Sequence, residues 1–275
     1  MCRWVAYSGA PISLEDLLYR PAHSLIDQSL NSTHGVETTN GDGFGVGWYT
    51  GTKPGTYHST NPAWNDHNLG NLAGHIRSPI FLAHVRASTG TPVQESNCHP
   101  FRFERWLWMH NGAIAQWPRV KRDLALAVAP DLFPSIEGST DTEVMFFLAL
   151  TFGLRDDPPG AVARMAGFVE AVADEHGIEN ALQMTIATSD GEHLWAFRYS
   201  TPRESRSLFY STDVPTLRRL HPDNELLQQL CEGSRLIVSE PLGDLAGAWN
   251  AVPEGVYSMI NGDTAAMSPF APVTP

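Results

Sequence analysis

The residue with the clearest capacity for chemistry is Cys2. If an aminopeptidase removes Met1, which the small cysteine side chain permits, a thiol and a free α-amine stand on one residue. An α-amine has a reference pKa of ~7.7–8.0, so part of it is neutral and basic near neutral pH. A nucleophile and its proton acceptor would then share one amino acid. Taken alone, these residues favour the simpler interpretation that Cys2 is an ordinary second residue.

An arginine in a predicted strand is the second candidate. Composition and alternation predict a strand over residues 81–88. A two-residue period places polar side chains on one face and apolar ones on the other: His84, Arg86 and Ser88 against Phe81, Ala83 and Val85. An arginine among apolar neighbours needs an anionic partner, either an Asp or Glu of the chain, which is commoner, or a substrate carboxylate. We expect His84 to be a hydrogen-bonded structural residue and not a catalyst.

A second predicted strand, over residues 105–110, runs into Asn111-Gly112. Asn-Gly is a strong hairpin signal, because both residues tolerate positive φ. The same geometry has a functional alternative. A tight turn can aim the Gly112 N–H and the Asn111 amide at one point, as an oxyanion hole requires.

Two further patterns are ambiguous by themselves. A helix is predicted to begin near Asp141, with Thr140 and Glu143 as a capping box, and the helix dipole alone favours an acid in its first turn. Alternating glycines over residues 40–49 match neither the dinucleotide nor the P-loop spacing. They indicate either a strand with one face open to close approach of a backbone or ligand, or the tip of a hairpin.

Composition limits the classes of function. The net charge is -12 and no Lys/Arg cluster is present, which argues against nucleic-acid binding. The longest apolar run, over residues 144–152, is too short to span a bilayer, and residues 8–11 interrupt the apolar start of the chain before it could form a signal peptide. The three cysteines are too few for a disulfide framework, so we expect a cytoplasmic protein. Neither metal-ligand spacings nor a serine-nucleophile motif occur.

The helices and strands expected around these residues indicate an α+β fold. Two helices, beginning near residues 141 and 160, stand against runs of antiparallel strands in the last third of the chain. Residues 50–74 are polar and are expected to form a surface loop. The sequence contains neither an internal repeat nor a long linker, so residues 1–275 are expected to form one domain.

Together, the ordered motifs resemble a known family. Cys2, the strand ending at residues 83–89, Asn97-Cys98-His99-Pro100, His110-Asn111-Gly112 and residues 139–143 occur in the order seen in class II glutamine amidotransferases. Those proteins are N-terminal-nucleophile hydrolases that cut the side-chain amide of glutamine. Residues 40–45, 239–242, Trp249 and Val252-Pro253 are similar to a stand-alone branch that includes the γ-glutamyl amide hydrolases of ergothioneine biosynthesis.

This resemblance implies a four-layer αββα sandwich with two mainly antiparallel sheets and a set of roles. Cys2 would attack the γ-carbonyl, with Asn111 and Gly112 stabilising the oxyanion. The remaining matched positions would bind substrate: Arg86 the α-carboxylate, Asp141 the α-ammonium, with Thr89 and His99 as lesser support. A thioester would form and water would release glutamate, with no metal or redox cofactor.

Two positions depart from the larger members of the family, which often carry an aromatic residue after the arginine and a histidine after the threonine. Here these positions are Ala87 and Gly90, which leave room for a bulky leaving amine. We therefore favour a hydrolase that acts on a small-molecule γ-glutamyl amide. The alternatives are a subunit that supplies ammonia to a separate synthase, and an inactive binding domain that kept the fold.

Overall fold

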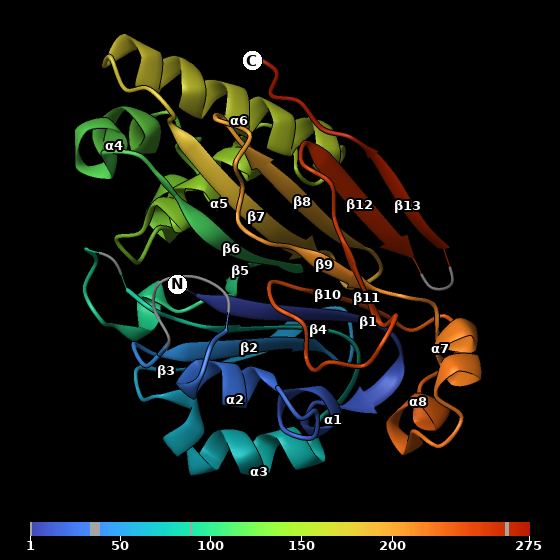
Figure 1. Ribbon diagram of the computed structural model, residues 1–275. Helices are drawn as coiled ribbons and strands as arrows, with labels where there is room; N and C mark the ends of the chain where they lie inside the picture. Colours follow the sequence, from blue (N-terminus) through green and yellow to red (C-terminus); the bar gives the residue numbers. More distant parts are fainter. Residues whose placement is uncertain (1, 34–38, 89, 262–263) are drawn as a thin grey trace.

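The computed structural model describes residues 2–33, 39–88, 90–261 and 264–275, and its centre is a pair of stacked sheets (Figure 1). Strands follow one another across the first sheet in the order β11 (Trp249–Ala251), β9 (Phe209–Ser211), β10 (Arg235–Val238), β1 (Arg3–Ser13), β4 (Arg77–Val85), β2 (Phe44–Tyr49) and β3 (Pro54–Ser59). The second sheet has the order β13 (Thr264–Pro269), β12 (Val256–Asn261), β8 (Leu194–Ser200), β7 (Leu182–Ser189), β6 (Trp106–Ile114) and β5 (Phe101–Phe103). All neighbouring strands pair antiparallel.

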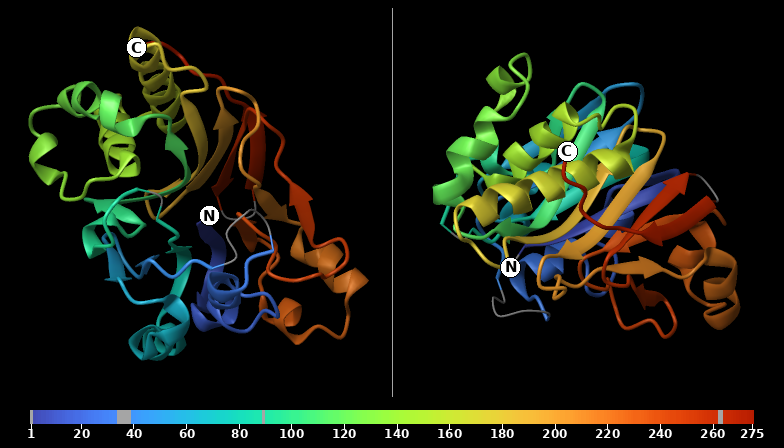
Figure 2. Two further views of the ribbon diagram at one scale, coloured as in Figure 1. Left: turned by 60° about the vertical axis from the view of Figure 1, so that its left-hand side comes forward. Right: turned by 90° about the horizontal axis from the view of Figure 1, so that it is seen from above.

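Helices cover the outer face of each sheet, which gives four layers (Figures 1 and 2). The second sheet is covered by α4 (Trp117–Leu126), α5 (Asp141–Thr151) and α6 (Pro158–Glu175). The first sheet carries α1 (Glu15–Leu18), α2 (Leu25–Leu30), α3 (His67–His75), α7 (Val214–Leu220) and α8 (Glu225–Gln229). Short 3₁₀ turns occupy Ala63–Asn65, Glu95–Asn97 and Phe133–Ser135. The α+β class and the αββα sandwich are thus confirmed.

Three hydrophobic cores, one in each space between layers, follow from the two-residue period of the strands. In β1, Val5 packs under the helices of the first sheet, while Trp4 and Ala6 pack between the sheets. In β6, Leu107 packs between the sheets and Trp108 faces the helices of the second. Both faces of these strands are buried, so β1 and β6 are rigid positions from which to present side chains.

Several predicted boundaries differ from the structure. The strand predicted over residues 81–88 ends at Val85, and β1 continues to Ser13 through a register shift after Ser8. The prediction of a surface loop over residues 50–74 is wrong, because this segment contains β3 and most of α3. Only half of the predicted capping box is present: Thr140 caps α5, but the Glu143 carboxylate accepts hydrogen bonds from the backbone N–H groups of Glu137 and Gly138.

Two of the alternating glycines, Gly45 and Gly47, lie in β2, a strand with neighbours on both sides, so the hairpin-tip interpretation is wrong. A Cβ atom at Gly45 would lie 2.3 Å from the His99 backbone oxygen, and one at Gly47 would lie 2.8 Å from side-chain atoms of Leu107 and Pro100. Close approach of another backbone, the other interpretation, is confirmed. It allows residues 99–100 to pack directly on the first sheet.

Candidate active site

Cys2 stands at the start of β1, between β10 and β4 in the middle of the first sheet. Its thiol contacts the segment that follows β4, with Sγ 3.3 Å from the Ala87 nitrogen and 3.4 Å from the Ala87 oxygen. Burial raises the pKa of the Cys2 thiol, and the Ala87 hydrogen bond and nearby arginines only partly offset this effect. The thiol is therefore protonated at neutral pH, and its use as a nucleophile requires a base.

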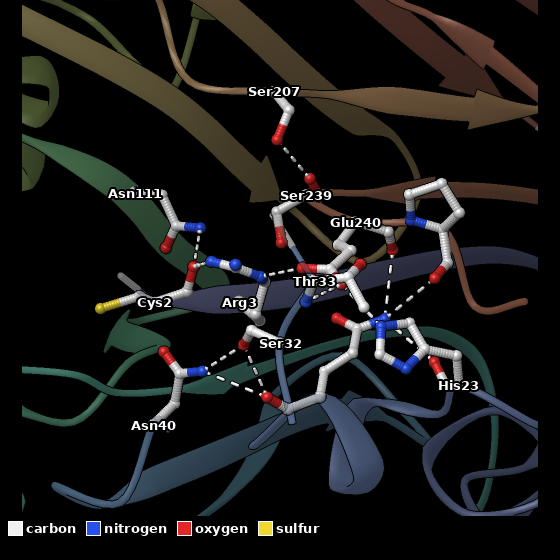
Figure 3. Close-up of polar contacts among 12 residues, drawn as sticks. Cys2, Arg3, His23, Ser32, Thr33, Asn40, Asn111, Ser207, Ser239 and Glu240 are labelled. Atoms are coloured by element: carbon white, nitrogen blue, oxygen red, sulfur yellow. Dashed lines mark hydrogen bonds and ion pairs between the residues drawn. The ribbon is translucent and has the colours of Figure 1, made fainter. Parts of the chain in front are cut away.

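A cavity of about 310 Å³ opens beside Cys2. Its lining includes the residues that the sequence singled out from distant parts of the chain: Cys2, Arg86, His99, Gly112 and Asp141. Asn111 lies next to the cavity, where its Nδ2 donates a hydrogen bond of 2.8 Å to the Cys2 carbonyl (Figure 3). Thr89 lies outside the described residues. The fold thus gathers six of the seven predicted residues.

Asn111 is held at both ends of its side-chain amide. Its Oδ1 lies 3.1 Å from Nε2 of His84, and a carbonyl oxygen only accepts, so His84 donates. Burial lowers the pKa of His84 to about 3, which keeps the ring neutral with its proton on Nε2. The expected hydrogen-bonded structural role of His84 is confirmed. This contact turns the Asn111 NH₂ group toward Cys2, which uses one of its two hydrogens.

Gly112 lies inside β6 and not in a hairpin turn, so the hairpin interpretation of Asn111-Gly112 is wrong. Its φ is +147°, and a Cβ atom there would lie 1.9 Å from the Gln183 oxygen of β7. Both the conformation and the space therefore require glycine. Gly112 lines the cavity on the second sheet, opposite Cys2 on the first, and Asn111 lies beside it with its NH₂ group on the Cys2 carbonyl.

Arg86 is buried, with 4% of its surface exposed, and among the described residues its guanidinium donates to neutral oxygens. Nη2 donates to the hydroxyls of Thr91 at 2.6 Å and Ser88 at 3.1 Å, and Nη1 to the Asp42 backbone oxygen at 3.4 Å. In the part of the chain that the structure describes, no carboxylate forms an ion pair with Arg86. The sequence suggested two kinds of anionic partner for Arg86. An Asp or Glu of the chain is not found among the described residues, so the Arg86 cation remains at the cavity wall.

Asp141 begins α5, where Thr140 caps the helix. One carboxylate oxygen accepts from the Ile114 N–H of β6 and the other from the Thr142 N–H, each at 2.8 Å. These two bonds fix the carboxylate at the cavity wall while leaving lone pairs free for a ligand. A cation and an anion, Arg86 and Asp141, thus line one small cavity with a thiol.

Two histidines, His99 and His110, line the cavity, and His84 packs against His99. The His99 ring packs 4.2 Å from His84, and its Nδ1 accepts a 3.5 Å hydrogen bond from the His110 backbone. His110 Nε2 donates to the Gln183 oxygen, so its Nδ1 accepts from the Thr142 hydroxyl. Burial lowers the pKa of all three rings. Arg86 and Asp141 therefore stand out as the charged groups of this wall.

Sequence reasoning missed several residues that shape the site. Thr91 and Asp42 hold Arg86, but nothing in their local sequence distinguishes them from turn residues. Asp42 also accepts from the Ser88 N–H at 2.7 Å, which ties the glycine-rich segment to the loop after β4. The signals for Asp42 in the sequence were its place among the alternating glycines and in the motif at residues 40–45.

Comparison with known proteins identifies the family. The family model described as "Glutamine amidotransferases class-II" matches residues 22–268. The chain belongs to this family. Among curated members, it is 34% identical to "Probable glutamine amidotransferase DUG3" of Saccharomyces cerevisiae, over 98% of this chain and 84% of that protein. It is 30% identical to "Gamma-glutamyl-hercynylcysteine sulfoxide hydrolase" of Mycolicibacterium smegmatis, over 92% of this chain and 93% of that one.

Solved structures agree with this assignment. A Silicibacter pomeroyi protein described as a "glutamine aminotransferase class-II domain protein" superposes with a TM-score of 0.75 at 33% identity, over 99% of this chain and 100% of that one. The phosphoribosylpyrophosphate amidotransferase of B. subtilis shares the fold, with a TM-score of 0.67 at 16% identity over 98% of this chain and 49% of that chain.

Among the described residues, no helix combines the length and apolar character needed to cross a membrane.

Proposed function

We propose that this amidotransferase hydrolyses a γ-glutamyl amide bond through a thioester on Cys2 and releases glutamate. The observation that carries the proposal is Arg86, a buried guanidinium without a carboxylate partner among the described residues, in one cavity with Cys2 and Asp141. A γ-glutamyl head group is a zwitterion, and it needs one cation and one anion at a fixed separation. Arginine suits the carboxylate because it can donate two parallel hydrogen bonds.

In this mechanism Arg86 binds the α-carboxylate and Asp141 the α-ammonium, with Thr89 and His99 supporting the pocket. The side chain of the substrate then extends toward Cys2. Once Met1 is removed, the α-amine of Cys2 takes the thiol proton, which answers the need for a base that the raised pKa of the thiol creates. The sulfur attacks the γ-carbonyl carbon and its oxygen becomes an oxyanion.

Asn111 and Gly112 would stabilise that oxyanion through the second Nδ2 hydrogen and the Gly112 N–H. The α-ammonium of Cys2 returns its proton to the leaving amine as the C–N bond breaks, which leaves a γ-glutamyl thioester. Water, deprotonated by the same α-amine, then attacks the thioester and releases glutamate and the thiol. These steps use the chain's own groups.

The leaving amine is proposed to be larger than ammonia. Ala87 and Gly90 both line the cavity, and a Cβ at Gly90 would meet open space. The name of one relative, the "Gamma-glutamyl-hercynylcysteine sulfoxide hydrolase" of Mycolicibacterium smegmatis, supports this proposal, whereas the name of the yeast relative, a glutamine amidotransferase, fits free glutamine. We further propose that residues 1–275 work as one domain and need no synthase partner to release glutamate.

The test is a panel of γ-glutamyl amides, including free glutamine and γ-glutamyl peptides, incubated with purified protein whose loss of Met1 has been verified by mass. Cys2→Ala should abolish glutamate release on every substrate. Cys231→Ala is the matched control, because that half-buried thiol contacts Ala10 and Ser234 outside the cavity. Equal release by wild type and Cys2→Ala on all substrates would refute the mechanism.

A further inference from the structure

The Cys2 carbonyl has a second anchor besides Asn111. Arg3 Nη1 donates a 3.0 Å hydrogen bond to it, so two donors from opposite sheets meet on one oxygen (Figure 3). Pairing of β1 with β4 begins at Arg3 opposite Val85, so Cys2 lies outside the strand ladder. Its carbonyl oxygen is held by these two side-chain donors.

Glu240 orients the Arg3 side chain. The Arg3 Nε–H donates to Glu240 Oε2, and both side chains are 1% to 2% exposed. The other carboxylate oxygen accepts from the Thr33 N–H at 2.8 Å, the Thr33 hydroxyl at 2.6 Å and His23 Nε2 at 2.6 Å (Figure 3). Burial alone would raise the pKa of Glu240, but the hydrogen bonds that it accepts outweigh burial and lower it to about 2.

We propose that Arg3, oriented by Glu240, is a positioning residue that fixes the main chain of Cys2 for attack. The inference rests on the proposed function and adds two residues to its machinery. One planar guanidinium spans the distance from the Glu240 carboxylate to the Cys2 carbonyl through Nε and Nη1. The ammonium of a lysine is a single point charge and cannot hold both acceptors in this geometry.

This role goes beyond the contribution of a buried ion pair to folding. Such pairs add little net stability, because desolvating both charges offsets their attraction. Here the pair ends on the carbonyl of the reacting residue. Rotation of that peptide plane moves both the Cβ–Sγ bond and the α-amine, and a displacement of about 1 Å can cost on the order of 100-fold in rate.

The experiment compares Glu240→Gln and Arg3→Lys with wild type in steady-state glutamate release and in the alkylation rate of Cys2 by iodoacetamide. We expect kcat to fall on the order of 10- to 100-fold with KM changed much less, and alkylation to slow. Asp66→Asn is the matched control: another buried carboxylate that accepts from Tyr57 and Leu69 at the start of α3. Even if Asp66→Asn lowers the melting temperature as much as Glu240→Gln or Arg3→Lys does, its kcat should stay at the wild-type value.

A double variant, Arg3→Met with Glu240→Met, separates positioning from folding. Removing both charges together avoids the unpaired buried guanidinium that Glu240→Gln alone leaves, so a low kcat in the double variant is not caused by such a charge. Recovery of wild-type kcat in this double variant, or unchanged kcat in both single variants, would overturn the inference. If wild type releases no glutamate from any substrate, the proposed function fails instead, and the alkylation rates still report on the placement of Cys2.

Discussion

Acidification should destabilise the protein through His84, because the buried imidazole resists taking up a second proton in the folded state. In the unfolded chain the imidazole has a pKa of ~6.5, whereas complete burial beside Asn111 lowers the pKa of His84 to about 3 in the folded protein. The unfolded state therefore binds a proton that the folded state does not. The stability that His84 contributes is present above pH ~6.5 and is lost as the pH falls below it.

The magnitude follows from the two pKa values. Each pH unit below the unfolded pKa costs ~1.4 kcal/mol, so lowering the pH to about 5 costs about 2 kcal/mol through His84. His58, His99 and His110 act in the same direction, because burial lowers their pKa values too. His23 acts oppositely: burial lowers its pKa, but hydrogen bonds to Glu240 and Asp27 outweigh burial and raise it.

Urea unfolding followed by circular dichroism at about pH 7.5 and pH 5 isolates His84 from these other histidines. His84→Gln can still donate to Asn111 but does not titrate in this range. We expect wild type to lose about 2 kcal/mol more unfolding free energy than His84→Gln between the two pH values. His75→Gln, at an exposed histidine, should lose as much as wild type. Equal losses in wild type and His84→Gln would refute the assigned burial and tautomer.

Further variants test the cavity residue by residue. Asn111→Ala should lower kcat on the order of 100- to 1000-fold with the fold intact by circular dichroism, and a change under about threefold would exclude it from the oxyanion hole. Gly112→Ala should cost about 1–3 kcal/mol or more in urea unfolding, because its Cβ would lie 1.9 Å from the Gln183 oxygen; Gly51→Ala, where a Cβ meets nothing within 4 Å, should be neutral. Arg86→Ala should raise KM mainly for substrates with a free α-carboxylate, and an equal rise for analogues lacking that group would contradict its role.

The fold class could be predicted because the runs of strands in the last third and the starts of the two long helices are recognisable in the sequence. The helix predicted to begin near residue 160 is α6, which begins at Pro158, and the antiparallel strands predicted in the last third include β7 and β8. Polar or short elements such as α3 and β3 were missed, because tertiary packing and not local periodicity stabilises them. Asn111-Gly112 was ambiguous for the same reason: φ at Gly112 is set by the close approach of β7, which no local pattern encodes.

The candidate site was predictable in its residue types but not in its supports. Cys2, Arg86 and Asp141 have chemistry that is visible in the sequence once their order is considered. Glu240 lies 237 positions from Arg3 along the chain, and its only sequence signal was the motif at residues 239–242. Contacts between such distant positions depend on strand order, which a single sequence does not specify.

If Cys2 carries the γ-glutamyl group during turnover, the group can be trapped on it. The measurement is mass spectrometry of acid-quenched protein mixed with a γ-glutamyl amide, followed by digestion and mapping of the modified peptide. We expect an N-terminal peptide that begins at Cys2, lacks Met1 and carries one γ-glutamyl group, which hydroxylamine removes. Glutamate release by protein that retains Met1, or a γ-glutamyl group found only on another residue, would contradict this role of Cys2.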